Sequence, residues 1–146
     1  MKIAILNGPN LNLLGTREPE IYGNRSFEDF LAELKTRFPE VVFHYFQSNH
    51  EGALIDELQL LNNKTDGIIM NAAGYSHTSI ALADTIAAIN TPVVEVHISD
   101  IYKREPFRRH SYTALYAKHI ITGKGLEGYA EAVTFLLTLL KRDRGT

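Results

Sequence analysis

Residues 67–98 read GIIMNAAGYSHTSIALADTIAAINTPVVEVHI, and this stretch decides the fold. Two short apolar runs, Ile68–Met70 and Val93–Val96, flank a segment in which Leu82, Ile86 and Ile89 recur at helical spacing. An Asn-Thr-Pro sequence interrupts the helical pattern before the second run. Because short, largely β-branched runs are typical of strands buried in a parallel sheet, the stretch predicts a strand–helix–strand unit.

The same alternation extends toward both ends of the chain. Similar buried strands are expected at Ile3–Leu6, Val41–Phe46 and His119–Thr122, and a helix capped by Ser26 is expected to end before Pro39. Five strand–helix units with no long polar linker predict an α/β fold. We expect a flavodoxin-like, doubly wound sheet of five parallel strands in the order 2-1-3-4-5.

The composition bounds the possible functions. The chain has 146 residues, of which 45% are apolar, which predicts one catalytic or binding domain over residues 1–146. The formal charge of -2 provides no general attraction to nucleic acid or to an anionic membrane. The absence of cysteine excludes disulfides, thiolate metal sites and a cysteine nucleophile. The sequence also shows no signal-peptide pattern and no membrane-spanning run, so it predicts a cytoplasmic protein. Its expected partners are a small molecule and other copies of itself.

Polar residues follow four of the predicted strands. These segments are Asn7–Asn10, Gln47–Glu51, Asn71–His77 and His97–Ser99. In a doubly wound sheet, ligands bind beyond the carboxyl ends of the strands, so the sequence predicts an active site at this edge.

Two predicted connections are longer than usual for this fold. They are a lid loop at about residues 9–25 and an arginine-rich loop at about residues 100–117. The first contains Arg17 and Tyr22, and the second contains Lys103, Arg104, Arg108 and Arg109. Arginines at a ligand-binding edge favour a carboxylate or phosphate ligand.

Several common motifs lead to no cofactor or metal prediction. Residues Gly123–Gly128 match the G-x-G-x-x-G pattern, but no later strand supplies the acidic ribose-binding residue, so we predict a tight turn there. The histidines lack metal-ligand spacing, and His44, His110 and His119 are expected to be structural or surface residues. The nucleophile pattern G-x-S-x-G is absent. The sequence therefore predicts no cofactor and no metal.

Five motifs closely resemble those of the type II 3-dehydroquinate dehydratases. They are NGPNLNLLGTREPEIYG (7–23), QSNHEG (47–52), NAAGYSHTS (71–79), EVHIS (95–99) and REPFRRHS (104–111), and they keep the family's order over nearly the whole chain. Two positions depart from the family, which often has proline where Ala72 stands and asparagine where Asp100 stands. An inward-pointing Asp100 would weaken the binding of an acidic ligand.

The resemblance implies dehydration of 3-dehydroquinate to 3-dehydroshikimate by anti elimination through an enolate, with neither metal nor Schiff base. Tyr22 would act as the base, and Arg17 would lower its pKa. Asn10 would hold a water against the enolate oxygen, and His97 would protonate the departing hydroxyl. Glu95, two residues earlier on the same strand face, would orient the His97 ring.

The resemblance also implies the binding residues and the assembly. The substrate carboxylate would be bound by Asn71 and the backbone N–H groups of Ile98 and Ser99. The ring hydroxyls would be bound by three further side chains: Arg108, His77 and Asp84. Members of the family usually form trimers grouped into dodecamers, with this aspartate reaching into a neighbouring site.

The helix pattern independently points to a subunit contact near Asp84. Ile80, Ala83, Asp84 and Ala87 share a second helix face, away from the stripe expected to pack on the sheet. A sister subunit is the simplest cover for such a face.

Two alternatives are left open by the residues. One is a non-catalytic flavodoxin-like module that binds an anion, although a magnesium-dependent receiver would need acidic residues where Asn7, Asn10 and Asn71 stand. The other is a lyase of the same fold that acts on another polyhydroxy keto acid. A biosynthetic role and a role in quinate breakdown fit the sequence equally well.

Overall fold

The computed structural model, which describes residues 1–16 and 24–145, contains a five-stranded sheet in the order β2-β1-β3-β4-β5. The strands are β1 (Lys2–Asn7), β2 (Val42–Gln47), β3 (Gly67–Asn71), β4 (Val93–His97) and β5 (His119–Thr122), and all neighbouring pairs are parallel. The predicted fold class and strand order are therefore confirmed.

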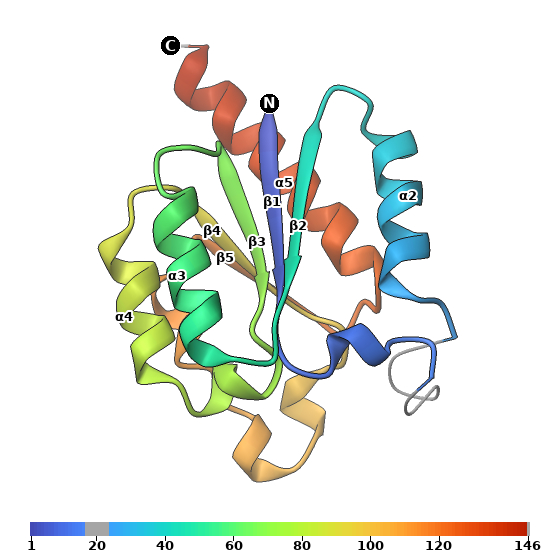
Figure 1. Ribbon diagram of the computed structural model, residues 1–146, viewed down its shortest axis with the longest axis vertical. Coiled ribbons are helices and arrows are strands. Elements are labelled where there is room, and N and C mark those ends of the chain that lie inside the picture. The colour runs from blue at the N-terminus through green and yellow to red at the C-terminus, as the bar shows by residue number, and fades with distance from the viewer. Residues whose placement is uncertain (17–23, 146) are drawn as a thin grey trace.

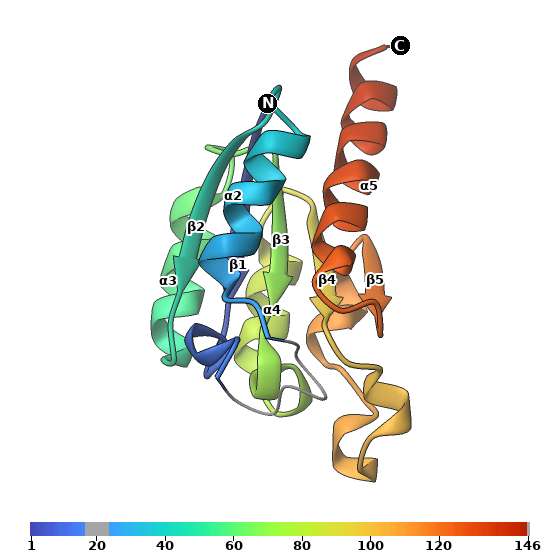
Figure 2. The same ribbon diagram turned by 90° about the vertical axis from the view of Figure 1, so that its right-hand side faces the viewer.

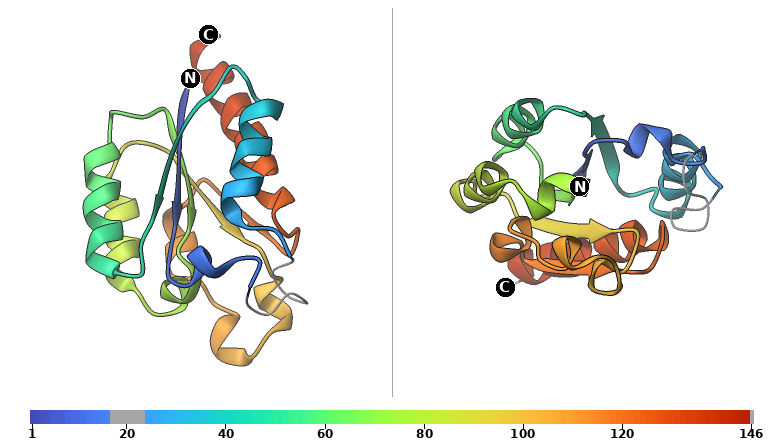
Figure 3. Two further views of the ribbon diagram at one scale, coloured as in Figure 1. Left: turned by 45° about the vertical axis from the view of Figure 1, so that its right-hand side comes forward. Right: turned by 90° about the horizontal axis from the view of Figure 1, so that it is seen from below.

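Helices cover both faces of the sheet (Figures 1 and 3). The face covered by α2 (Phe27–Arg37) and α5 (Glu127–Arg144) is opposite the face covered by α3 (Glu51–Leu61) and α4 (Ile80–Ala88). Alternate residues of β1 enter the two cores: Ile3 and Ile5 pack on the first side, and Ala4 and Leu6 on the second. A strand buried on both faces explains why the sequence of β1 is continuously apolar.

Local signals set the helix boundaries. The Ser26 hydroxyl accepts a hydrogen bond from the Asp29 N–H at 3.1 Å, as expected of an N-cap, and α2 ends before Pro39. The turn before α5 uses Gly123 and Gly125 in left-handed conformations, with φ values of 74° and 60°. The glycine motif therefore forms the predicted tight turn.

One strand differs from the prediction. The run at Val41–Phe46 was expected to be buried, but β2 spans Val42–Gln47 at an edge of the sheet, and Val42 is 63% exposed. His44 is also exposed and contacts Glu57 at 2.9 Å. The reason is its edge position, which leaves β2 with one neighbouring strand and less cover from the helices.

Short 3-10 helices follow the carboxyl ends of β1, β3 and β4, at the lower edge in Figures 1 and 2. They are η1 (Leu11–Leu13), η2 (Ala73–His77), η3 (Ile101–Lys103) and η4 (Pro106–Arg108), whereas η5 (Thr113–Tyr116) packs against α4 and leads back to the start of β5. The predicted arginine-rich loop thus contains three helical turns, η3 to η5. Residues 17–23 of the predicted lid loop lie outside the described residues.

Two chain segments approach each other closely where β1 and β3 end. The Gly8 N–H donates to the Asn71 carbonyl at 2.7 Å, and a Cβ added at Gly8 would lie 2.6 Å from the Ala72 carbonyl oxygen. That distance is far below van der Waals contact. Gly8 therefore allows the two strand exits to pass side by side.

We expect Gly8→Ala to lower the free energy of unfolding by about 1–3 kcal/mol, because the new methyl group forces backbone apart from backbone. Gly52→Ala is the matched control, since a Cβ there meets no atom within 4 Å and Gly52 lies in α3. Alanine at this helical position should stabilise by up to about 1 kcal/mol. Urea titrations measure both, and a Gly8→Ala protein as stable as wild type would contradict this packing argument.

Candidate active site

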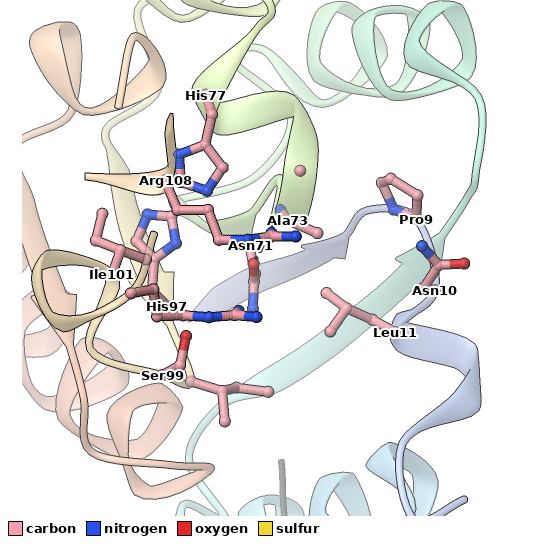
Figure 4. A pocket seen from close by; sticks show the side chains of 13 residues that line it. Pro9, Asn10, Leu11, Asn71, Ala73, His77, His97, Ser99, Ile101 and Arg108 are labelled. Atoms are coloured by element: carbon pink, nitrogen blue, oxygen red, sulfur yellow. Dashed lines mark hydrogen bonds between the residues drawn. The ribbon is translucent and has the colours of Figure 1, made fainter. Parts of the chain in front are cut away.

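A cavity of about 190 Å³ lies at the carboxyl edge of the sheet. Seven residues predicted from the sequence line it: Asn10, Asn71, His77, His97, Ile98, Ser99 and Arg108. In Figure 4, Pro9, Asn10 and Leu11 lie on one side of the cavity, and His77, His97 and Arg108 lie on the other. The structure therefore brings together predicted residues that are up to 98 positions apart in the sequence, Asn10 and Arg108.

Asn10 is held at the first strand exit by its backbone. It adopts a left-handed conformation with a φ of 70°, and its N–H donates to Asn49 Oδ1 at 3.0 Å. Gln47 Nε2 donates to the same oxygen at 3.2 Å and to the Gly8 carbonyl at 3.1 Å. The exits of β1 and β2 are thus tied together beside the cavity, with the Asn10 side chain exposed toward solvent.

His97 and Glu95 form a buried pair behind the cavity. His97 Nε2 lies 2.7 Å from Glu95 Oε2, and the two side chains are 5% and 1% exposed. Because a carboxylate only accepts hydrogen bonds, Nε2 carries the proton of the neutral ring. The remaining nitrogen, Nδ1, is then the one able to exchange a proton with a ligand.

Two hydroxyls complete the surroundings of Glu95. The Ser111 hydroxyl donates to Glu95 Oε2 at 2.6 Å, and the Thr113 hydroxyl donates to Oε1. Burial alone would raise the pKa of the Glu95 carboxyl, but hydrogen bonds from His97, Ser111 and Thr113 hold that pKa below its usual range. Glu95 therefore stays ionised beneath His97.

His77 presents one defined nitrogen to the cavity. Its Nδ1 lies 2.7 Å from the His110 carbonyl, which only accepts, and His110 Nε2 lies 2.7 Å from the His77 carbonyl in return. Burial lowers the pKa of His77, and the nearby positive charge of Arg108 acts in the same direction. A neutral His77 has its Nε2 lone pair available to accept from a ligand hydroxyl. His110 is a structural partner, as predicted.

Arg108 reaches the cavity from η4. Its Nε donates to Glu105 Oε2 at 2.7 Å, and this ion pair lowers the pKa of the exposed Glu105 carboxyl. The cavity thus has a guanidinium on the side of the two histidines.

One predicted binding residue, Asp84, does not line this cavity. Asp84 is an exposed residue of α4, and its described neighbours offer it no hydrogen bond. Arg17 and Tyr22 lie outside the described residues. The proposed second face of α4 needs one correction: Ala83 is 4% exposed because α4 packs against η5, whereas Ile80 is 60% exposed.

Asp100 does not line the cavity either. Its carboxylate caps η3 by accepting from the Tyr102 N–H at 3.1 Å. This arrangement separates Asp100 from the ligand space that an inward-pointing carboxylate would have disturbed.

Three residues with a place in the site were missed by sequence reasoning. Ser111 and Thr113 hold Glu95, and Tyr129 of α5 contacts Asn71. Ser111 stands in a quoted motif, but no local pattern in the sequence distinguishes Thr113 or Tyr129 from core residues.

Residues 1–16 and 24–145 lack two features, a metal-binding cluster and a membrane-spanning helix. No group of three or more His, Asp or Glu side chains in these ranges is arranged to hold a metal ion. No helix in these ranges is long and apolar enough to cross a membrane.

A doubly wound sheet with a polar cavity where β1, β3 and β4 end defines an α/β protein that binds a small polar ligand at its carboxyl edge. The family model described as Dehydroquinase class II matches residues 1–137. The chain belongs to this family, as its motifs predicted.

Known relatives cover nearly the whole chain. It is 47% identical over 144 residues to the 3-dehydroquinate dehydratase of Clostridium botulinum (strain Okra / Type B1), spanning 97% of this chain and 98% of that relative. It is 43% identical over 146 residues to the catabolic 3-dehydroquinase of Verticillium alfalfae, with coverages of 98% and 97%. The crystal structure of type II dehydroquinase from Butyrivibrio crossotus DSM 2876 superposes with a TM-score of 0.90 at 42% identity, covering 93% of this chain and 97% of that one.

The buried Glu95 carboxylate should make stability depend on pH. A carboxyl whose pKa is lowered by folding stabilises the fold above its unfolded value of about 4.3, and this contribution is lost as pH falls through the lower, folded-state pKa. We expect the free energy of unfolding of the wild type to fall more steeply below about pH 4.3 than that of Glu95→Gln. At pH 7, Glu95→Gln should be less stable by roughly 1.5–3 kcal/mol.

Urea titrations between acidic and neutral pH make this comparison. Glu105→Gln is the control, because its carboxyl also has a lowered pKa but is exposed to solvent, where ion pairs contribute little. Equal pH dependence in the wild type and Glu95→Gln would contradict the account of the buried pair.

Proposed function

We propose that this chain is a type II 3-dehydroquinate dehydratase, a hydro-lyase that converts 3-dehydroquinate to 3-dehydroshikimate. The carrying observation is the buried Glu95–His97 pair at a cavity of fitting size in a member of the dehydroquinase class II family. A non-catalytic anion-binding module has no use for an ionised carboxylate buried beneath a histidine. The named relatives favour 3-dehydroquinate over other polyhydroxy keto acids.

The reaction requires a base, an acid and stabilisation of the enolate between them. Tyr22 removes a proton next to the ketone, and Arg17 favours the tyrosinate form by its positive charge. Asn10 holds a water against the enolate oxygen. His97 then donates a proton to the departing hydroxyl, so that water leaves and the carbon–carbon double bond forms. Glu95 orients the His97 ring for this transfer by accepting the hydrogen bond from its Nε2.

The substrate is bound by neutral donors at one end and by polar side chains at the other. The backbone amides of Ile98 and Ser99 follow His97, the last paired residue of β4, so the sheet no longer uses their N–H groups. Together with Asn71 they bind the carboxylate through fixed dipoles, without the hydration cost of a buried lysine. His77 and Arg108 bind the ring hydroxyls, and Asp84 of a neighbouring subunit completes that end.

Residues 1–146 act as one catalytic domain, with the loops at about 9–25 and 100–117 bordering the substrate. No cofactor is needed, because the elimination releases water with no net oxidation or reduction and side chains can carry its proton transfers. A cytoplasmic location stays a prediction from the sequence.

The surface around Asp84 supports assembly with further copies of the chain. Ile80 of α4 and Leu115 and Tyr116 of η5 are 60%, 70% and 54% exposed, and the two elements are in contact. Large exposed apolar side chains on adjoining elements are typical of a subunit interface. Trimers, grouped into dodecamers, place Asp84 in the neighbouring site.

Turnover is tested by mixing the protein with 3-dehydroquinate and recording ultraviolet absorbance, since only the product has a conjugated enone. We expect absorbance to rise with the wild type and not with Tyr22→Phe, which lacks the base but binds the substrate in calorimetry. Absence of turnover by the wild type would overturn the proposed activity. Near-normal turnover by Tyr22→Phe would assign the base to another residue.

Mixing two inactive variants tests whether Asp84 acts in trans. Asp84→Ala and Tyr22→Phe are unfolded together and refolded, and random assortment around a closed ring should leave about a quarter of sites intact. The expected result is recovery of about a quarter of wild-type activity. If Asp84 served its own chain, every site would carry one lesion. No recovery, with mixed oligomers confirmed by mass, would therefore disprove the contribution in trans.

A further inference from the structure

A buried tyrosine lies beneath the cavity and has no part in the proposed proton transfers. Tyr129 of α5 is 0% exposed, and its hydroxyl contacts the ends of two strands. It donates to Asn7 Oδ1 at 2.7 Å and accepts from Asn71 Nδ2 at 3.0 Å. Asn71 also lines the cavity, so a residue of the last helix is linked directly to the ligand-binding surface.

The partners of Asn71 permit one orientation of its amide. The Ala73 N–H donates to Asn71 Oδ1 at 3.0 Å, and a backbone N–H can only donate, so its partner must be an oxygen. On the other side, the single proton of the Tyr129 hydroxyl is used on Asn7, which leaves a lone pair facing Asn71 Nδ2. Reversing the amide would place Asn71 Oδ1 against the lone pair of the Tyr129 hydroxyl. It would also place Asn71 Nδ2 against the Ala73 N–H. One Nδ2 proton therefore remains for the cavity.

The surroundings of Tyr129 keep this arrangement fixed. Its ring packs against Phe27 at 4.9 Å between centroids and Phe30 at 6.3 Å. Burial raises the pKa of Tyr129 well above its ordinary value, so the hydroxyl keeps its proton throughout the range in which enzymes work. Asn7 in turn donates to the Tyr45 hydroxyl at 3.3 Å. A chain of four side chains thus runs from β2 to the cavity.

We propose that Tyr129 is a positioning residue that fixes the Asn71 amide with its free N–H directed at the substrate carboxylate. The inference rests on the proposed function in one respect, the identity of that substrate. A donor fixed before binding loses little conformational freedom when the ligand arrives, which is why positioning raises affinity. The carboxylate does not react, so its contacts are equal in the ground and transition states, and their loss raises KM while kcat changes little.

Tyr129→Phe and Tyr45→Phe form a matched pair for the test. Each replaces a tyrosine by its nearest isostere beside Phe27, and each removes one hydroxyl of the same chain. Of these two tyrosines, only Tyr129 contacts Asn71. We expect Tyr129→Phe to raise KM for 3-dehydroquinate by up to about tenfold at nearly constant kcat, and Tyr45→Phe to leave KM within about twofold. Equal KM values for the two variants would overturn the proposal.

A double-mutant cycle distinguishes positioning from general destabilisation. If Tyr129 acts through Asn71, then adding Tyr129→Phe to Asn71→Ala should raise KM no further. A rise as large as in the wild-type background would show that Tyr129 acts by another route and would overturn the proposal.

Crystal structures of the variants decide the inference independently of any substrate. The Asn71 side chain should be displaced or occupy several rotamers in Tyr129→Phe and be unchanged in Tyr45→Phe. An Asn71 that stays in place in Tyr129→Phe overturns the proposal even if the wild type dehydrates 3-dehydroquinate. A displaced Asn71 without wild-type turnover supports the positioning role and overturns the proposed function alone.

A second variant covers the case in which Tyr129→Phe does not fold. Asn7→Ala removes the oxygen that takes the Tyr129 proton, so the hydroxyl proton turns toward the Asn71 N–H and repels it. The same displacement of Asn71 and a rise in KM are expected. An unmoved Asn71 with unchanged KM in Asn7→Ala would overturn the proposal.

Discussion

The pairing of Asn7 with Asn71 at the ends of β1 and β3 is the constraint on which the site depends. Parallel strands bring their carboxyl ends to the same edge, and helices must return the chain to the opposite edge each time. Two amide side chains therefore meet at one point although they lie 64 positions apart in the sequence. Gly8 makes the close approach possible, because its N–H bonds to Asn71 where a side chain would clash with Ala72.

Two separate networks of polar side chains lie below the cavity. One set runs through Tyr129 and Asn7 into the first core, and the other joins His97 to Glu95, Ser111 and Thr113. Within the described residues, every buried side-chain nitrogen and oxygen atom has a hydrogen-bond partner. Unpaired buried groups cost about 1–3 kcal/mol each, so these networks are consistent with a stable fold only because they are complete.

The two networks give the cavity two different chemical characters. On the His97 side, a full negative charge on Glu95 lies buried beneath the ring and accepts its hydrogen bond. On the Asn71 side the donors are neutral, with backbone amides and one fixed side-chain N–H. In the proposed binding mode, such neutral donors hold the substrate carboxylate less tightly than an arginine would, which suits an enzyme that must release a similarly charged product.

The amino-acid sequence determined the alternation of strands and helices, the strand order and most of the residues that line the cavity. These features follow from local periodicity and from the rule that parallel strands end at one edge, so short segments suffice to predict them. The motifs added the family, since residues such as His97 and Asn71 stand at characteristic positions. The exposure of β2, the Thr113–Glu95 contact and the Tyr129–Asn71 contact were decided only by the tertiary structure. They depend on which helix packs over which strand. The local sequence of a helix or of a strand does not specify which distant segment it will contact.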